Sequence, residues 1–557
     1  MPICAIVSMS LCLQDAGIRV NLARDLSSRA ELAHYLDRVA AGQPNVAYVR
    51  PEVEALLARW AMIRDVLAGE EAVKLHDLVT LESGAPSLTT DLYYRYLPQP
   101  NPSVQDAANI ERYRQYIERA VFYPVTGRTH DGLVGQAFLR KPVIELPVGL
   151  EYLADDCDGA GVGIEAQARK SLGQNLGFGF GGLLTDYPPV PPGMTKAQQE
   201  AMNIRPAILL YEPEQVINWR TKVIGSKRVL VMVVLAESYE TSDDGFEIKT
   251  APQWRRLLLD DTGGYVVELY RQATVDGKAE FQMVPGYPVI PLNSSGQRFA
   301  HIPYHPFGAI NNDPEPDPAP MYQHAALNVA HYRCSADYFE SAYYNGQTTA
   351  AVFGITDDWW KDVLKGKLNL GARGGIPLPP GGGIDGYQPG PNTLSYEAMQ
   401  HIELQMASLG AKLIEQKAVN ITATEARQNH ASEISVLGTC AVNIASVYTM
   451  AINDAAEFVG AEQTGKFEID PEFELGSLTA QELQQVVACW KDKAISTSEM
   501  RDKLAKAGLA TLSIDDFQSE MDEEKPETAP EPVAPIVVPD NEEQAPVGDE
   551  GQPEGGA

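Results

Sequence analysis

Three carboxylates lie close together in the segment DDCDGAG, residues 155–161. Carboxylates spaced around a loop glycine are the ligands with which an EF-hand loop binds Ca²⁺. With Gly159 as that glycine, Asp156, Asp158 and Glu165 fall on ligand positions, but Ala154 stands at the first one. The register on Gly161 fits less well. The pattern therefore favours a solvated turn, or an acidic helix start, over a metal site.

Two glycine-rich stretches invite comparison with nucleotide-binding loops. GARGGIPLPPGGG, residues 371–383, holds six glycines and three prolines. A P-loop needs Lys-Ser/Thr after its glycines and free backbone N–H groups; here that dipeptide is missing and the prolines remove donors. GFGFGG, residues 177–182, follows a helical pattern and precedes an apolar run, which reverses the Rossmann order. Its glycines predict a tight crossing from helix to strand.

Catalytic motifs are missing from the rest of the sequence. We find no G-x-S-x-G, no H-E-x-x-H and no cysteine beside an activating partner. His324 and His331 lie two turns apart on one predicted helix, which is too far to share a metal, and are expected to be interface or core residues. The sequence thus predicts no catalytic residue, no metal ligand and no cofactor.

The composition points to an acidic intracellular protein. The 557 residues carry a net charge of −31 and are 44% hydrophobic, which suffices for two or three domains with real cores. Such charge argues against gripping nucleic acid through a basic surface, although DNA could still slide past. Six scattered cysteines without CxxC predict reduced thiols. The apolar start lacks a preceding basic residue, so we expect a soluble chain without a signal peptide.

The first half reads as helices followed by strands. Helices are predicted from Pro51 to Gly69, from Ser103 over SVQDAANIERYRQYIERAVF, and over 164–176. A β-rich region then runs to about residue 310, with a hairpin turn at Thr262-Gly263-Gly264. The polar, proline-rich NNDPEPDPAP follows as a connector.

The second half returns to helices. One is expected from Pro320 over about 25 residues to Asn345-Gly346. After a Gly/Pro-rich segment with short strands, a helix from Ser395 carries an apolar seam at 3-4-3-4 spacing: Met399, Ile402, Met406, Leu409 and Leu413. A capping box at Thr422 to Glu425 then predicts a helix to Gly460, roughly 50 Å long. Two shorter helices precede a proline- and carboxylate-rich tail that is expected to be disordered.

This order of parts resembles the portal protein of tailed double-stranded DNA bacteriophages, and more closely a portal branch long catalogued as an uncharacterised phage family. The likeness spans roughly residues 50–510, and no single motif is diagnostic. It is carried by RAVFYPVTGRTHDGLVGQAFLRKP (119–142), GFGGLLTDYP (179–188), RPAILLYEPEQVINWR (205–220), QWRRLLL, HIPY, NVAHYRCSADY and TATEARQNHASEIS.

The resemblance implies an α+β portal-like subunit with a helical and β-rich wing, a two-helix stem, a small β clip, a helical crown and a disordered acidic tail. Its parts would be an N-terminal extension (1–50), the wing (51–318), stem helix 1 (319–345), the clip (346–394), stem helix 2 (395–416), a tunnel loop (417–423), a long wing helix (424–462), the crown (463–515) and the tail (516–557).

The resemblance also implies a function without catalysis. Portals form a ring, usually of twelve subunits, at one capsid vertex of the virion, after assembly in the cytoplasm of the host bacterium. Double-stranded DNA passes through non-specifically, and the partners are the terminase large subunit, a tail adaptor and the major capsid or scaffold protein; no membrane is involved. The DNA-tunnel loop would be Lys417, Ala418, Val419, Asn420, Ile421 and Thr422, and clip contacts would come from Trp359, Trp360, Arg373 and Tyr387.

Several alternatives stay open at this stage. The apolar seam suits either a packed ring or an ordinary core helix, and the two tryptophans suit either a partner contact or the clip's own small core. The acidic charge could line a channel or lie outside. A non-conducting capsid-associated scaffold or adaptor is the alternative function, and a metal-dependent hydrolase using the carboxylates of 155–158 is a third.

Overall fold

The computed structural model describes residues 46–82, 96–99, 106–188, 202, 204–275, 278–346, 349–365, 376–387, 393–413, 435–471, 487–491 and 493–506. The chain divides into two compact units, Met1–Phe473 and Glu474–Ala557. The described part of the second unit contains a helical stretch over 487–491 and helix α13 (Thr497–Lys506). The first unit is a mixture of helices and strands, so the α+β class is confirmed.

The helical start of the first unit differs from the prediction in two places. Helix α3 (Pro51–Ala68) ends at Gly69 as expected, and Gly69 takes the left-handed φ of +99°. Helix α4 (Glu70–Glu82) was not predicted; it begins directly after that glycine. Helix α5 (Ala107–Arg119) begins later than predicted, because the Asp106 carboxylate caps it by accepting from the N–H of Asn109.

Helix α6 (Val125–Ala137) was also missed, because its sequence VTGRTHDGLVGQA contains three glycines and few good helix formers. It forms because Leu133, Val134 and Ala137 are buried in a core shared with helix α7 (Ile164–Phe178) and helix α11 (Val436–Val459). Tertiary burial therefore overrides the low intrinsic propensity of this segment.

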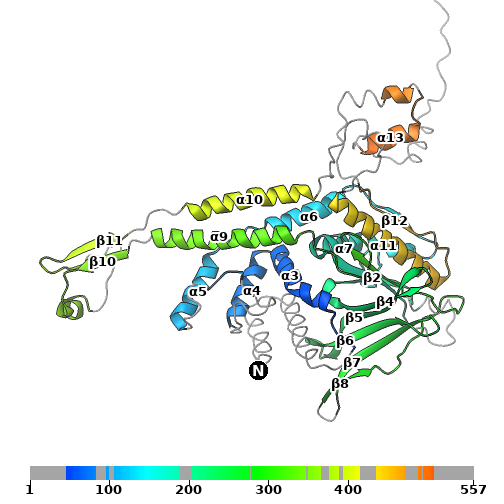
Figure 1. The fold of residues 1–557 in the computed structure, drawn as a ribbon, viewed down its shortest axis with the longest axis horizontal. Helices are drawn as coiled ribbons and strands as arrows, with labels where there is room; N and C mark the ends of the chain where they lie inside the picture. The colour runs from blue at the N-terminus through cyan, green and yellow to red at the C-terminus, as the bar shows by residue number, and fades with distance from the viewer. Residues whose placement is uncertain are drawn as a thin grey trace, which may run out of the picture. The chain divides into compact units, whose positions relative to one another are not determined.

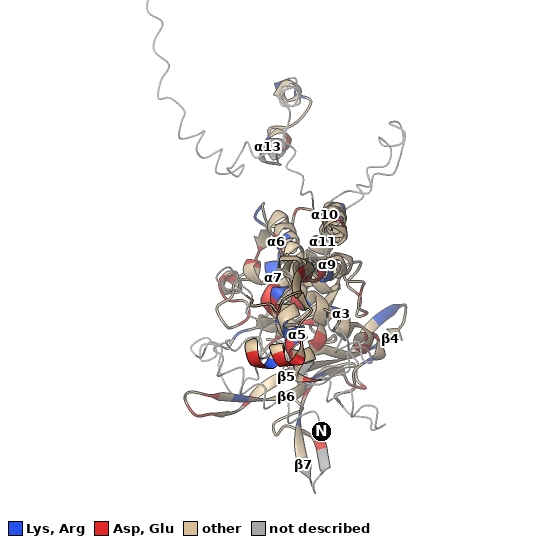
Figure 2. Ribbon diagram, turned by 90° about the vertical axis from the view of Figure 1, so that its left-hand side faces the viewer, with Lys and Arg blue, Asp and Glu red and all other residues tan. Residues whose placement is uncertain are grey.

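Two antiparallel sheets form the β-rich part of the unit (Figure 1). The smaller sheet has the order β3 (Ala207–Tyr211), β2 (Phe180–Asp186), β9 (Tyr304–Gly308). The larger sheet runs in chain order through β4 (Val216–Ile224), β5 (Lys227–Asp243), β6 (Ile248–Leu259), β7 (Tyr265–Val275) and β8 (Lys278–Met283). The predicted turn at 262–264 does join β6 to β7, and Figure 2 shows that Lys and Arg gather at the free end of β4.

The glycines of GFGFGG make the tight helix-to-strand crossing that the sequence predicted. Gly179 ends α7 in the left-handed conformation, with φ of +69°. Strand β2 follows at once, and a Cβ on Gly182 would collide with the ring of the buried Tyr304 on β9. These glycines allow close packing between the helix and the sheet rather than nucleotide binding.

Helix α11 lies at the centre of the second core and packs on α7, β2 and β9. Its start corrects the sequence prediction: Ser435 is extended (φ −63°, ψ 165°), and its hydroxyl accepts from the N–H of Gly438 at 3.1 Å. One helix cannot therefore run unbroken from 424, and 24 residues span about 36 Å instead of 50 Å. The capping box at 422–425 lies outside the described residues. The predicted end at Gly460 is confirmed.

Within the described residues, α11 is the one helix long and apolar enough to cross a membrane. Its apolar residues form part of the protein core, in which Ile444, Tyr448 and Ile452 are fully buried. A small sheet of β1 (Val143–Glu145) and β12 (Lys466–Glu468) packs on the helix, and the ring of Tyr448 lies tilted against Phe467 of β12 at 5.2 Å between ring centroids.

A buried carboxylate ties α11 to the region before and within β9. The two oxygens of Asp454 lie 2.9 Å from Nε2 of His301 and 2.7 Å from Nε2 of His305. The hydrogen bond that His301 donates to Asp454 raises the pKa of His301, against the opposing effect of burial. Two imidazoles thus share the one charge that α11 buries at this point.

We expect Gly182→Ala to lower the free energy of unfolding by about 1–3 kcal/mol, because the added methyl group would displace the Tyr304 ring. Gly132→Ala on α6 is the control, since open space surrounds a Cβ there, and it should be neutral or slightly stabilising. Thermal and urea unfolding of the two variants measure the difference. Equal stability of both variants would contradict the close approach of β2 to β9.

We expect Asp454→Asn to destabilise the protein by about 2–4 kcal/mol, because both imidazoles lose their charged partner. The raised pKa of His301 means that its contribution is full below the unfolded imidazole pKa of about 6.5 and is lost as the pH rises through the folded value. The loss of stability should therefore be larger near pH 5.5 than near pH 8.5, measured by urea unfolding. Asp261→Asn, an exposed change, should show no such pH dependence.

Candidate functional site: the α9–α10 helix pair and its hairpin

Two helices that enclose a hairpin form the candidate functional element. Helix α9 (Tyr322–Gly346) leads into β10 (Thr349–Phe353), and β11 (Gly383–Tyr387) returns to helix α10 (Leu394–Lys412). The helices pack on each other along their length (Figure 1). The buried residues of α9 end at Ala336, and α10 buries only Met399 and Met406. Beyond Ala336, α9 is therefore held by α10 and by polar and cation–π contacts from α5.

Polar contacts join the middle of α9 to α5 and the segment after it. The Tyr116 hydroxyl donates to a carboxylate oxygen of Asp337 at 2.6 Å, and Nε of Arg119 donates to Glu340 at 3.0 Å. Burial, followed by the nearby Asp337, raises the pKa of Tyr116, so the phenol stays a donor. The Ser335 hydroxyl accepts from the N–H of Val121 and donates to its C=O. These hydrogen bonds therefore fix the direction of α9 relative to α5.

A buried polar cluster fixes the start of α9 on α6. The Thr126 hydroxyl donates to Oδ1 of Asn328 at 2.8 Å and lies 2.9 Å from Nδ1 of His324. Because the hydroxyl has one proton, the Nδ1 of His324 is the donor in the second contact. The amide of Asn328 donates to the C=O of Tyr123 at 2.9 Å. Burial lowers the pKa of His324, which keeps this imidazole neutral.

The predicted apolar seam of α10 is its buried side. Met399 and Met406 are buried, and Ile402, Leu409 and Leu413 are half-buried. On the same interface, Nε2 of the buried His331 lies 3.1 Å from a carboxylate oxygen of Glu403. The prediction that His324 and His331 are core or interface residues is thus confirmed. Packing on α9 explains the seam as an intrachain contact, which is the core-helix alternative.

The hairpin between the helices is held by its strand pairing and by a tryptophan contact. Strands β10 and β11 pair from Thr349↔Tyr387 to Phe353↔Gly383. Between them a π-helical turn (Trp359–Val363) brings Trp359 to the glycine-rich stretch, where its Nε1 donates to the C=O of Pro377 at 3.1 Å. This contact favours the structural alternative for Trp359. Trp360 is half-buried beside it, and Arg373 and the tunnel-loop residues 417–422 lie outside the described residues.

The described end of GARGGIPLPPGGG is a turn that enters β11. The N–H of Gly382 donates to the C=O of Pro379 at 2.9 Å, and Gly381 adopts a φ of +87°. A Cβ on Gly383 would collide with the Phe353 ring across the hairpin. The glycines and prolines therefore shape the hairpin.

The carboxylates of DDCDGAG act within their own loop. Asp156 accepts from the N–H of Gly161 at 2.9 Å and pairs with Arg205 at 2.6 Å, and the backbone bond is the main reason why the pKa of Asp156 is lowered. Asp158 accepts from the N–H groups of Ala160 and Val162. These bonds within the loop agree with the turn interpretation. No cluster of three or more ligating side chains within the described ranges is placed to hold a metal.

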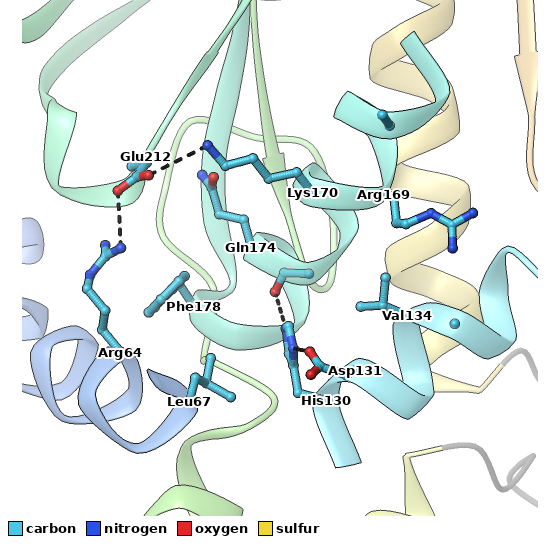
Figure 3. Close-up of a pocket in the computed structure, with 13 residues that line it drawn as sticks. Arg64, Leu67, His130, Asp131, Val134, Arg169, Lys170, Gln174, Phe178 and Glu212 are labelled. Atoms are coloured by element: carbon cyan, nitrogen blue, oxygen red, sulfur yellow. Dashed lines mark hydrogen bonds and ion pairs between the residues drawn. The ribbon is translucent and has the colours of Figure 1, made fainter. Parts of the chain in front are cut away.

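A groove of about 550 Å³ lies between α3, α6 and α7 (Figure 3). Its charged walls are paired: Arg64 bonds to Glu212 at 3.1 Å, and Nε2 of His130 lies 2.8 Å from the C=O of Gly173. The described cysteines are free thiols, and burial raises the pKa of Cys157 and Cys440 to about 12, which keeps both protonated. These arrangements hold elements together and supply no activated nucleophile.

Sequence reasoning missed the Thr126–Asn328 cluster and the His301–Asp454–His305 cluster. Each joins segments more than a hundred residues apart in the chain. Polar residues on otherwise apolar helix faces were the available signal, as with Asp454 in the apolar run of α11. Such a signal marks one partner and cannot identify the other.

Comparisons with known proteins give one family match, which covers the helix pair and its hairpin. A family described as "Domain of unknown function (DUF4055)" matches residues 320–459, about a quarter of the chain. No curated protein matches the chain.

Two solved structures cover 70% of this chain and 91% of their own at 16% identity. One is titled "Virion of native gene transfer agent (GTA) particle", with a TM-score of 0.32. The other is titled "Neck of empty GTA particle computed with C6 symmetry", with a TM-score of 0.34. TM-scores this low do not establish a shared fold.

We expect Thr126→Val to lower the free energy of unfolding by about 1–3 kcal/mol, because it leaves His324 and Asn328 without their shared hydroxyl in a buried site. Urea unfolding measures the effect, with Thr250→Val on the exposed part of β6 as the matched control. Limited proteolysis should also cut near the start of α9 faster in the Thr126 variant. An unchanged stability would show that the cluster does not hold the helix pair.

Proposed function

We propose that this chain is a portal protein of a tailed double-stranded DNA bacteriophage, a structural component of the virion. The observation that carries the proposal is the order helix, hairpin, helix and core helix over α9, β10–β11, α10 and α11. This is the stem, clip, stem and wing-helix order implied by the sequence resemblance. The family match begins and ends with the same segment, residues 320–459.

In this proposal the α9–α10 pair is the stem and the β10–β11 hairpin is the clip. The distal part of the pair and its surroundings expose several aromatic rings, and aromatic side chains are enriched where proteins bind one another. These are Phe339, Tyr343, Tyr344 and Tyr396. The clip would contact the terminase large subunit during packaging and the tail adaptor afterwards, and the wing would contact the major capsid or scaffold protein.

The proposed mechanism is passive conduction. The chain carries a net charge of −31, and an acidic channel wall repels DNA phosphates so that a duplex slides without sticking. The buried polar contacts between α9 and the wing would hold the stem helices at a fixed angle while DNA moves past. This mechanism requires no covalent chemistry from any of the described residues.

Electron microscopy of the purified full-length protein tests the proposal. We expect closed rings of about twelve subunits around a channel wide enough for duplex DNA. Particles that remain monomeric, or that lack a channel, would contradict it and would favour a non-conducting scaffold or adaptor.

Deletion of residues 417–422 tests conduction separately. We expect rings to form but packaging of DNA into capsids to fall at least tenfold, since the resemblance places the tunnel loop there. Deletion of six residues from the C-terminal end, 552–557, is the length-matched control. Normal packaging by the 417–422 deletion would contradict the conducting role.

A further inference from the structure

Strand β5 is long enough to extend beyond its sheet at both ends. Its first residues pair only with β4, from Lys227↔Ile224 to Leu230↔Thr221, and its last residues pair only with β6, as far as Asp243↔Ile248. Strand β6 reaches β7 only from Gln253 onward. The sheet therefore carries a two-stranded ribbon at each end of β5, and 17 residues separate the ribbon tips by about 55 Å.

The ribbon formed by β4 and β5 is basic; we call it the basic ribbon, residues 220–228. It holds Arg220, Lys222, Lys227 and Arg228, all exposed, and the chain has no carboxylate from 216 to 236. Val223 and Ile224 at its tip are 71% and 55% exposed. In the described part of the chain none of the four cations has an ion pair.

The ribbon formed by β5 and β6 is acidic; we call it the acidic ribbon, residues 240–248. It holds Glu240, Asp243, Asp244 and Glu247, all exposed, and Lys249 is the cation beside them. Phe246 at its tip is fully exposed. Figure 2 shows the blue end of β4 and the red turn of the acidic ribbon on opposite sides of the view.

The turn of the acidic ribbon is held in one shape. The Asp244 carboxylate accepts from the N–H groups of Phe246 and Glu247 at 2.9 and 2.6 Å, and Asp243 accepts from the N–H of Gly245 at 2.7 Å. An exposed phenylalanine on a rigid turn costs little entropy to bury, so it is suited to contact with another surface.

We propose that the acidic ribbon of one copy binds the basic ribbon of a neighbouring copy of the same chain. Four carboxylates would face four cations, and Phe246 would cover Val223 and Ile224. The two ribbons lie at opposite ends of one strand, so a single copy cannot satisfy both. A contact between two different patches is heterologous, and heterologous contacts generate rings when the rotation closes. The contact between the two ribbons does not depend on the proposed function. Only the closure of the copies into a ring rests on it.

Charge reversal at each ribbon in the full-length chain tests this contact. One variant carries Glu240→Lys, Asp243→Lys and Glu247→Lys, which reverses the sign of the acidic ribbon and spares Asp244, the carboxylate that accepts two hydrogen bonds in the turn. The other carries Lys222→Glu, Lys227→Glu and Arg228→Glu, which reverses the sign of the basic ribbon. We expect each variant alone to show at least a tenfold smaller assembled fraction by mass photometry near physiological salt. The wild-type assembly should weaken as salt rises, because exposed charges are screened.

Mixing the two reversed variants is the decisive measurement. Each variant alone has two ribbons of one sign, but the mixture offers opposite signs at every contact, so assembly should return with the variants alternating. A single chain carrying all six substitutions should assemble by itself. Glu54→Lys with Glu118→Lys and Glu462→Lys, at exposed sites on other elements, is the matched control and should assemble like the wild type.

Several outcomes would overturn the contact. Normal assembly of the reversed variants would overturn it. So would a loss of assembly that is restored neither by mixing the two variants nor by the sixfold variant. If only the variant with the reversed basic ribbon lost assembly, and only when duplex DNA was present, the result would show instead that the basic ribbon binds nucleic acid. A wild-type chain that stays monomeric would overturn both proposals. Rescue by mixing in assemblies that lack a channel would support the contact and contradict the portal function alone.

Discussion

The rest of the structure depends on the burial of helix α11. Its apolar face packs on α7, β2 and β9 and draws together segments from residues 133 to 469 in one core. Because apolar burial supplies the largest favourable term in folding, a helix that contacts so many elements sets where each of them lies. The glycine-rich α6 is helical only because this core accepts it, and the two imidazoles near β9 converge on the single carboxylate of α11.

The second constraint is polar. Helix α9 leaves the core after Ala336, so apolar burial cannot hold its direction beyond that residue. Hydrogen bonds from Tyr116 to Asp337 and from Arg119 to Glu340 hold this part of the helix, and they act at defined angles where apolar contacts would permit sliding. Such bonds fix the angle of the helix pair more closely than apolar packing alone would.

Local sequence patterns correctly predicted those elements whose start and end are marked by residues within the element or next to it. Pro51 and Gly69 bounded α3, the glycines near Thr262 marked a hairpin, and Gly460 ended α11. Predictions were wrong for two different reasons. The start of α11 was placed too early because the local cap at Ser435 was overlooked, and α6 was missed because the residues whose packing makes it helical lie far along the chain.

By itself, the sequence determined the α+β class, the alternation of helical and β-rich parts, and the structural use of its glycine-rich loops, because turn chemistry and hydrophobic period act within a few residues. Only the tertiary structure decided which side of α10 is buried, how Asp454 is satisfied, and that the charged segments around 224 and 246 stand at opposite ends of one strand. Those facts depend on strand register and on contacts between distant segments, which no local pattern encodes.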